Sequence, residues 1–452
     1  MSDAAHDRSS AFKGLLLILI GSLFLLHRFY PELGIGHLIR VYWPVLLIVW
    51  GVAKLIDHLS AQRAGGVRPP ILSGGEVALL ILTIVVLVGF AVGDIVRKGH
   101  PGMRINVDPF SEKYSESLEV PPAKIPAGAM LTIQTGLGSI SVHGGDVDQV
   151  RVSANQSASG HSEHAARERM KDARVILDKN DGGYLLHVVG QESFHGNIAV
   201  DLDVQVPKSI SLTATTPRGS ISVSDIAGGV TATADNGDVE IHDSGSDVTV
   251  ALRNGDARIT GVRGDARITG KGNEVEVSDV AGDATLEGDF YGPIRVRNVA
   301  KTTHYSSQRS DLTLLHLTGR LELDAGQIEI ADVAGFAKIT THNKDIEVEN
   351  VTGRLQIVDS HGNIVVHCSD PPREEIDIVN DSGEVDLTLP AKAAFEISAV
   401  TRGGEVQSDF EDASLKQSND SDTGRLTGRV GTRGPKINIV TSYGTIYLRR
   451  SS

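Results

Sequence analysis

A short phrase that begins with glycine returns along residues 219–366 and constrains the fold more than any other feature of the sequence. From Gly219 to Gly264 the beat is nine residues, and each copy joins a turn residue to an inward–outward–inward triplet. A fixed short period indicates a solenoid, and alternation with period two indicates short strands. The copies read GSISV (Gly219), GDVEI (Gly237), GDARI (Gly255 and Gly264), GDATL (Gly282), GRLEL (Gly319), GQIEI (Gly326), GRLQI (Gly353) and GNIVV (Gly362).

The length of one coil follows from chain reach and from charge. Nine extended residues span only about 30 Å, which is too little to close a coil around a filled interior, whereas about eighteen supply two strands and two corners. At eighteen residues per coil, acids and bases alternate along one outward row, Glu240, Arg258, Glu276 and Arg295. At nine, Arg258 would stack on Arg267, and like charges on adjacent strands are unfavourable. The sequence predicts an all-β fold, a parallel β-solenoid with about 18 residues and two short strands per coil.

The same coil length separates interior from surface. The inward rows are Val239, Ala257, Val275, Ile294 and Ile241, Ile259, Val277, Val296. These side chains are small or β-branched, which suits a narrow interior between strands. We therefore expect Ile259 and Ile268 to be buried, and Arg258 and Arg267 to be exposed to solvent.

Composition excludes several classes of protein and of site. The 452 residues carry a formal net charge of −14, which argues against nucleic acid as a partner. The single cysteine, Cys368, excludes an internal disulfide framework, and the sixteen histidines show no spacing typical of a ligand set. We expect no catalytic residue, no cofactor and no bound metal ion.

Three apolar runs precede the repeats and follow a polar tail at residues 1–10. They predict an α-helical membrane domain over residues 11–98, with helices at about 11–30, 41–58 and 76–97. The first two runs are short for a bilayer, so whether they span it fully or form a shallow hairpin stays open. Basic residues divide equally between the two sides, so the positive-inside rule does not fix the orientation.

The first sixty residues resemble a known membrane region. GLLLILIGSLFLLHRF is followed by YWPVLLIVWGVAKLI, in which Trp43-Pro44 and Gly51 are the most specific features. This pattern is similar to the paired transmembrane helices of the Lia-type envelope-stress proteins. The resemblance implies membrane anchorage and a role in the response to envelope stress.

The rest of the chain is assigned to a linker at residues 99–130 and the β-solenoid at 131–449. Two stretches interrupt the alternation. Within residues 161–177, alanine and methionine recur at helical spacing, which predicts a helical insert that caps the first end of the solenoid. Residues 412–434 are rich in Ser, Asp, Gly and Thr, and we expect a mobile loop.

Alternating segments on both sides of the repeats resemble the bacterial putative adhesin family. They read AVDLDVQV (Ala199–Val206), DLTLP (Asp386–Pro390), FEISAVTRGGEV (Phe395–Val406) and INIVTSYGTIYL (Ile437–Leu448). The resemblance implies a Gly-rich β-solenoid attached to membrane segments, without enzymatic activity. By analogy we expect a multi-pass protein of the inner membrane with its solenoid outside the cytoplasm, and as partners the lipid bilayer and an envelope protein or polysaccharide.

Three kinds of chemistry are weighed and set aside. The Gly-Asp repeats lack the double glycine of the calcium-binding β-roll, so we expect their aspartates to bond their own turns. His361, His367 and Cys368 fall short of a set of four zinc ligands. Polysaccharide-cleaving β-helices need converging acids, but the outward rows mix charges, and the acids between residues 370 and 377 have no evident partner.

Three functions remain open. The first is a membrane-anchored binding or scaffold module of the cell envelope. The second is a signalling modulator whose membrane helices contact a sensor kinase, as the Lia-type resemblance implies. The third is a scaffold that polymerises through exposed coil ends.

Overall fold

The computed structural model describes residues 112–160, 162–180, 182–193 and 196–451. The chain divides into two compact units, Met1–Lys113 with Ser159–Ala166, and Tyr114–Ala158 with Arg167–Ser452. The described residues are almost entirely β-strand and include one helix, α4 (Glu163–Met170). The all-β class predicted from the repeats is therefore observed.

Most strands belong to two hydrogen-bonded ladders, A and B, and the chain crosses between them at each corner. Ladder A contains β5 (Arg174–Asn180), β6 (Gly183–Val189), β2 (Met130–Gln134), β10 (Ser211–Thr216), β12 (Val230–Asn236), β14 (Val248–Asn254), β16 (Ala266–Gly272), β18 (Ala284–Phe290), β22 (Ala337–Thr340), β24 (Leu355–His361), β26 (Ile376–Ser382), β32 (Lys436–Tyr443), β28 (Phe395–Gly403), β31 (Thr423–Val430) and β30 (Lys416–Asp420). Ladder B contains β1 (Glu112–Lys124), β4 (Gln149–Gly160), β9 (Ala199–Pro207), β3 (Ile140–Gly145), β11 (Ile221–Ile226), β13 (Val239–Ser244), β15 (Ala257–Val262), β17 (Val275–Val280), β21 (Gln327–Val333), β23 (Asp345–Val351), β25 (Ile364–His367), β27 (Val385–Pro390), β33 (Ile446–Ser451) and β29 (Val406–Ser408). β19 (Ile294–Ser306) and β20 (Asp311–Leu323) cross both ladders, and β7 (Glu192–Ser193) and β8 (Gly196–Asn197) form a separate hairpin.

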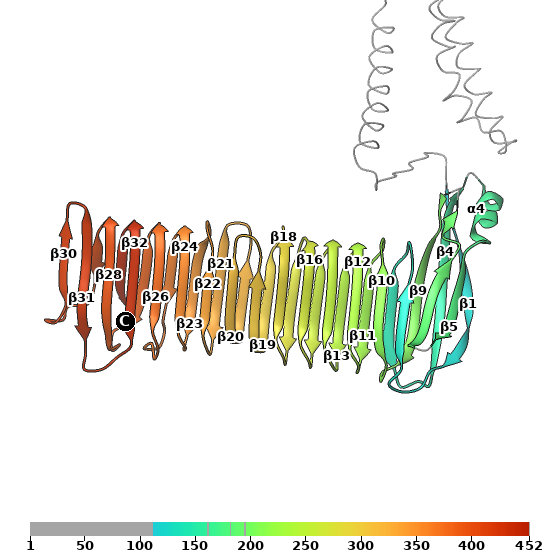
Figure 1. Cartoon of the computed structure of the whole chain (residues 1–452), viewed down its shortest axis with the longest axis horizontal. Helices are drawn as coiled ribbons and strands as arrows, with labels where there is room; N and C mark the ends of the chain where they lie inside the picture. Colours follow the sequence, from blue (N-terminus) through green and yellow to red (C-terminus); the bar gives the residue numbers. More distant parts are fainter. Residues whose placement is uncertain (1–111, 161, 181, 194–195, 452) are drawn as a thin grey trace, which may run out of the picture. The chain divides into compact units, whose positions relative to one another are not determined.

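From β10 to β18, parallel strands within each ladder pair residues eighteen apart in the sequence. In ladder B, Glu240 pairs with Arg258, and Arg258 pairs with Glu276. In ladder A, Thr249 pairs with Arg267. The predicted coil of about eighteen residues with two strands is confirmed along β10–β18, whose strands stack side by side in Figure 1.

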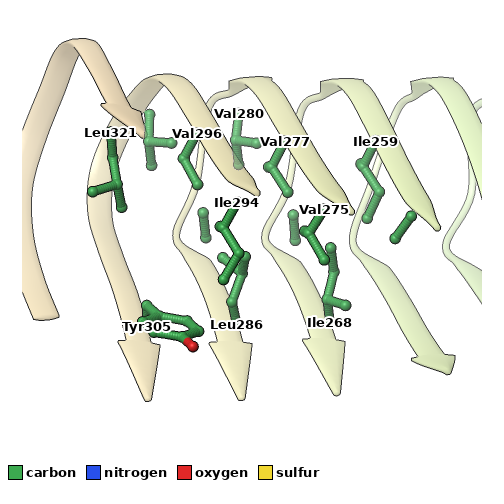
Figure 2. Close-up of a cluster of buried hydrophobic side chains, with 14 of the residues drawn as sticks. Ile259, Ile268, Val275, Val277, Val280, Leu286, Ile294, Val296, Tyr305 and Leu321 are labelled. Carbon is green, nitrogen blue, oxygen red and sulfur yellow. The ribbon is translucent and has the colours of Figure 1, made fainter. Parts of the chain in front are cut away.

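The interior lies between the two ladders and is lined by aliphatic side chains. Ile259 and Ile268 are 0% exposed, while Arg258 and Arg267 are exposed, so the predicted phase of the alternation is confirmed. Figure 2 shows one inward row of ladder A, in which Ile268, Leu286 and Tyr305 follow one another. Aliphatic and β-branched side chains pack well on such a pleated surface.

One coil runs in the reverse direction. β19 ends in a turn in which the Ser307 N–H donates to the Ser310 carbonyl, and the chain returns as β20, antiparallel to β19 across both ladders. β21 and β22 are again antiparallel to β20, after which parallel pairing resumes. The prediction of a parallel solenoid is therefore wrong for β20, which is antiparallel to its neighbours. The phrases at Gly319 and Gly326 begin only seven residues apart and form the two arms of a hairpin instead of successive corners.

The last coils do not follow sequence order. β32 and β33 lie between the coil of β26 and β27 and the coil of β28 and β29, and they pair in parallel with both. β28 then pairs with β31, and β31 with β30, at the end of ladder A (Figure 1). Residues 436–451 therefore connect the terminal strands to the rest of the solenoid.

Three predicted segments differ from the structure. β1 occupies much of the predicted linker. Pro121 and Pro122 do not prevent a strand there, since β1 lies at the edge of ladder B, where proline is tolerated. The helix predicted at 161–177 ends at Met170, since residues 174–180 form a hairpin with β6. The predicted mobile loop at 412–434 contains β30 and β31, whose polar composition reflects exposure at the end of the ladder.

The predicted polar tail and membrane helices, residues 1–98, lie outside the described residues. Among the residues from 112 onward, no helix is long and apolar enough to cross a membrane.

Candidate functional site

Aspartates at the corners connect successive coils. Asp238 Oδ1 accepts the N–H of Asp256 at 3.0 Å, and Asp256 Oδ1 accepts the N–H of Glu274 at 3.1 Å. The opposite corner repeats this pattern in the pairs Asp247–Asp265, Asp265–Asp283 and Asp283–Thr302. The prediction that these aspartates bond their own turns is wrong, because each carboxylate points along the stacking direction toward the N–H of the next coil. In the described part of the chain, no three His, Cys, Asp or Glu side chains are grouped to hold a metal ion.

A hollow of about 300 Å³ lies beside the corner between β25 and β26. That corner is three residues longer than its predecessor, since Leu355 pairs with Ile376 whereas Ala337 pairs with Leu355. Its polar lining includes Asp332, Asn350, Thr352, Ser369, Asp370 and Arg373. The Asn350 amide donates to Asp332 Oδ1 at 3.0 Å, and Asn350 Oδ1 accepts the Ser369 N–H. These polar groups are therefore hydrogen-bonded to one another.

The cysteine and histidines weighed as metal ligands do not form a reactive group. Cys368 lines the hollow but is buried, and burial raises the pKa of its thiol to about 11. A thiol that stays protonated at neutral pH is a poor nucleophile and a poor metal ligand. His361 lies at the end of β24 and His367 at the end of β25, so strand β25 separates them.

Two of the acids clustered after Cys368 have structural partners. Glu375 forms an ion pair with Arg354 at 3.2 Å. Asp377 accepts a hydrogen bond from the Asn438 amide at 2.8 Å, which connects β26 to β32. The partner of Asp377 is not evident in the sequence, because Asn438 is sixty-one residues away and is brought close only by the insertion of β32.

The outward row of ladder B is a charge ladder, as predicted. The Arg258 guanidinium lies 3.8 Å from Glu240 and 3.0 Å from Glu276. Two ion pairs do not follow the strand register. Arg295, which is opposite Glu276, forms its ion pair with Glu274, and Arg267, which lies between Thr249 and Thr285, reaches Glu287 diagonally at 2.6 Å.

Ladder A carries an apolar outward row near its end, which we call the valine row. It comprises Val358, Val379, Val440 and Val400 on the adjacent strands β24, β26, β32 and β28. Val379 and Val440 are 37% and 38% exposed. Earlier coils place Thr215, Thr233, Ala251 and Thr269 in the same row. Apolar side chains gathered on a flat sheet surface mark a candidate interaction site.

The predicted pattern of polar outward residues does not include the valine row. The sequence nevertheless contains a weak signal for it. In INIVTS and IDIVND, the outward position after two inward isoleucines is valine instead of a polar residue. Within one strand, such a break in alternation is common. Only the insertion of β32 beside β26 makes the exposed valines contiguous.

The edge strands at both ends of the solenoid have features that oppose further strand pairing. At the far end of ladder B, the Asn419 amide accepts the Val406 N–H at 3.0 Å and donates to the Val406 carbonyl at 3.1 Å. Gln417 donates to the same carbonyl at 2.7 Å. At the other end, β1 contains two prolines and β5 is largely charged or polar where it is exposed. Prolines and charges on edge strands oppose edge-to-edge association.

Comparison with solved structures finds several similar chains. A putative cell adhesion protein from Clostridium sporogenes is 10% identical, with 75% of this chain and 100% of that chain covered and a TM-score of 0.17. A putative adhesin from Bacteroides fragilis is 12% identical, with 75% and 97% covered and a TM-score of 0.18. A putative adhesin from Parabacteroides merdae is 10% identical, with 75% and 96% covered and a TM-score of 0.19. A comparison with curated proteins finds no match.

Two family models match separate parts of the sequence. Residues 11–55 match the LiaI-LiaF-like transmembrane region, and residues 270–449 match the Toastrack domain DUF4097. Both resemblances seen in the sequence are thereby confirmed, and the chain is associated with a membrane through its first residues.

Proposed function

We propose that this chain, which joins a LiaI-LiaF-like transmembrane region to a Toastrack DUF4097 domain, is a membrane-anchored, non-enzymatic binding or scaffold module of the bacterial cell envelope. The proposed anchor crosses the cytoplasmic membrane more than once and holds the solenoid on the extracytoplasmic side. Its proposed partners are the lipid bilayer and a protein or polysaccharide of the envelope.

The valine row is the observation that carries this proposal. It places exposed apolar side chains side by side on one hydrogen-bonded sheet, and the polar residues Asp377 and Asn438 flank it along β26 and β32. Apolar centres with polar surroundings are typical of protein interaction surfaces. The corner aspartates, in contrast, are engaged with backbone N–H groups, and Cys368 is buried and neutral.

The test uses a photo-crosslinking amino acid at Val379 in the full chain, expressed in membranes. We expect Val379 to capture a discrete partner. The matched control is Thr233, which occupies the same outward row of ladder A but lies between threonine and alanine instead of valines. Equal capture from both positions, or none from either, would contradict the valine row as the binding surface.

The second candidate is a signalling modulator that acts through its membrane helices, and the LiaI-LiaF-like match at residues 11–55 favours it. A cell that lacks this chain should then respond abnormally to cell-wall antibiotics in a stress-reporter assay. Restoration of the response by residues 1–111 alone would favour signalling, while a requirement for Val379 and Val440 would favour binding. A reporter enzyme fused after Ser452 fixes the side of the membrane on which the solenoid lies.

A further inference from the structure

A column of buried polar side chains follows one corner of ladder A. Asp359, Asn380, Thr441 and Thr401 pair with one another across β24, β26, β32 and β28, and all are at most 3% exposed. Buried polar groups in a folded protein are normally hydrogen-bonded, so each member needs a partner.

Two neutral members of this column donate to a carbonyl at the corner of an adjacent coil. Asn380 Nδ2 donates to the Gly362 carbonyl at 2.8 Å, and Thr401 Oγ1 donates to the Gly444 carbonyl at 2.8 Å. Far away in the same ladder, Thr216 Oγ1 donates to the Gly138 carbonyl at 3.0 Å. Where this position is polar, its side chain therefore acts as a hydrogen-bond donor, whereas at other coils it is apolar, as at Ala234 and Leu252.

Asp359 occupies this position without an evident donor. A methyl group built on Gly383 would lie 3.1 Å from Asn380 Nδ2 and 2.0 Å from the Gly362 carbonyl oxygen. On Gly362 it would lie 2.8 Å from Asp359 Oδ2 and 2.1 Å from the Lys344 carbonyl oxygen. Asp359 Oδ2 and the Lys344 carbonyl oxygen thus both border Gly362, just as the Asn380 amide and the Gly362 carbonyl oxygen both border Gly383.

Three buried acceptor atoms of this column have no hydrogen-bond partner. Neither carboxyl oxygen of Asp359 has a hydrogen-bond partner, and the same holds for Asn380 Oδ1. The Ser360 N–H lies near enough to lower the pKa of Asp359 but forms no well-aligned hydrogen bond with it. A proton on the Asp359 carboxyl would supply the missing donor, whereas an ionised carboxylate would face a carbonyl oxygen in a dry site.

We propose that Asp359 is held in the fold as a neutral carboxylic acid that donates its proton to the Lys344 carbonyl, so that loss of this proton loosens the coils around β24 and β26. The proposal deepens the proposed function and rests on it, since Val358 and Val379 of the valine row lie on these two strands. Proton loss would weaken the platform that holds the binding surface.

Charges around Asp359 are few. His342, His361 and Asp345 are the charged groups that act on it, and the Lys344 ammonium is engaged with the Asp324 carbonyl. Burial raises the pKa of Asp359 and is the largest effect, opposed by the Ser360 N–H and by the two histidines when they are protonated.

The sign of the pH dependence follows from this shift. The folded protein holds the Asp359 proton more tightly than the unfolded chain, whose aspartates titrate near pH 3.9. The contribution of Asp359 to stability is therefore complete below about pH 3.9 and is lost as the pH rises through the raised pKa of the folded state. Each unit of pKa shift corresponds to a tenfold change in the folding equilibrium.

The test compares thermal unfolding of the full chain with that of Asp359→Asn and Asp359→Thr between about pH 4 and pH 8. Both replacements place a neutral donor where Asn380 and Thr401 already donate. We expect both variants to unfold at a higher temperature than the parent at pH 8, with the difference shrinking toward pH 4. Glu347→Gln, which changes an exposed carboxyl of β23 that does not act on Asp359, should keep the slope of the parent.

An infrared measurement on the unmutated chain keeps the test independent of variant folding and of the proposed binding surface. A protonated carboxyl band should be present at mildly acidic pH in the parent and should be missing from Asp359→Thr. Parallel pH profiles for the parent and both variants, or the absence of this band, would overturn the proposal. So would a stability of the parent that depends on added cations, because an ion would then balance the carboxylate.

Discussion

At the scale of single residues, the corner aspartates must satisfy a backbone group without repelling one another. Stacked carboxylates about 4.8 Å apart repel by only about 0.9 kcal/mol in bulk water, and salt reduces this further. A hydrogen bond from an N–H to a charged acceptor contributes about 1.5–3 kcal/mol. The hydrogen bond outweighs the repulsion, which explains why aspartate recurs after the corner glycines despite its charge.

Asp256 tests this balance between hydrogen bond and repulsion. Asp256→Ala removes the acceptor of the Glu274 N–H and should lower the free energy of unfolding by about 1 kcal/mol in urea titrations. Asp256→Asn keeps an acceptor oxygen, and Asn363 already accepts the Glu384 N–H at 3.0 Å in another coil. It should therefore stay within about 0.5 kcal/mol of the parent. Equal losses for both variants would show that charge matters here more than the hydrogen bond.

Ile259 tests the interior. Ile259→Asp places an unpaired carboxylate in a site that is 0% exposed and should lower the free energy of unfolding by several kcal/mol, about 3 or more. Thr249→Asp is the matched control, because Thr249 points outward in an adjacent strand and pairs with Arg267. That control should stay within about 0.5 kcal/mol of the parent. Parent-like melting of Ile259→Asp would mean that the alternation has the opposite phase.

At the scale of strands and coils, the nine-residue beat predicts pairing partners but not strand direction. Parallel and antiparallel strands share the same alternation, so Leu321 and Leu323 of β20 look like any inward pair. The reversal has one trace in the sequence, the shortened spacing between Gly319 and Gly326. The reversal also places Glu322 directly opposite Glu329. Like charges in opposed positions are unfavourable, and here ion pairs of Glu322 with Arg297 and of Glu329 with Arg320 partly neutralise them.

The charge ladder gives a prediction for ladder B. Arg258→Glu replaces two attractions, to Glu240 and Glu276, by two repulsions, and each exposed pair contributes less than about 1 kcal/mol. We expect a modest loss of stability at low salt that shrinks as salt is raised, measured by urea unfolding. Arg263→Glu is the control, since Arg263 is exposed at the next corner and has no ion pair among the described residues. A loss that is equal for both variants and independent of salt would contradict the ladder.

At the scale of the whole molecule, the order of the coils could not be predicted. Interior rows are interchangeable, because Ile437 and Ile439 of β32 present the same inward pair as Ile376 and Ile378 of β26. The chain therefore could place residues 436–451 at the end or between earlier coils without changing the pattern. The candidate surface depends on that choice, since the valine row is continuous only with β32 in its observed place.

The last strand of ladder B bears on the choice between a monomeric module and a polymerising scaffold. Val406 would present its N–H and carbonyl groups to another strand if Asn419 and Gln417 did not bond them. Unpaired edges of this kind promote association between chains. A polymer of unmodified chains through this edge would first have to displace both amide side chains.

The double variant Gln417→Val, Asn419→Val should therefore associate as its concentration is raised. The measurement is the sedimentation coefficient of a chain that begins at residue 112 and so keeps β1. The control is Ser418→Val, which adds an equally apolar side chain at the intervening, exposed position of β30. It should sediment like the parent, which we expect to show no concentration dependence. Association of the parent itself would favour the polymerising scaffold. Equal association of the double variant and the control would attribute the effect to apolar surface, because only the double variant frees the hydrogen-bonding groups of Val406.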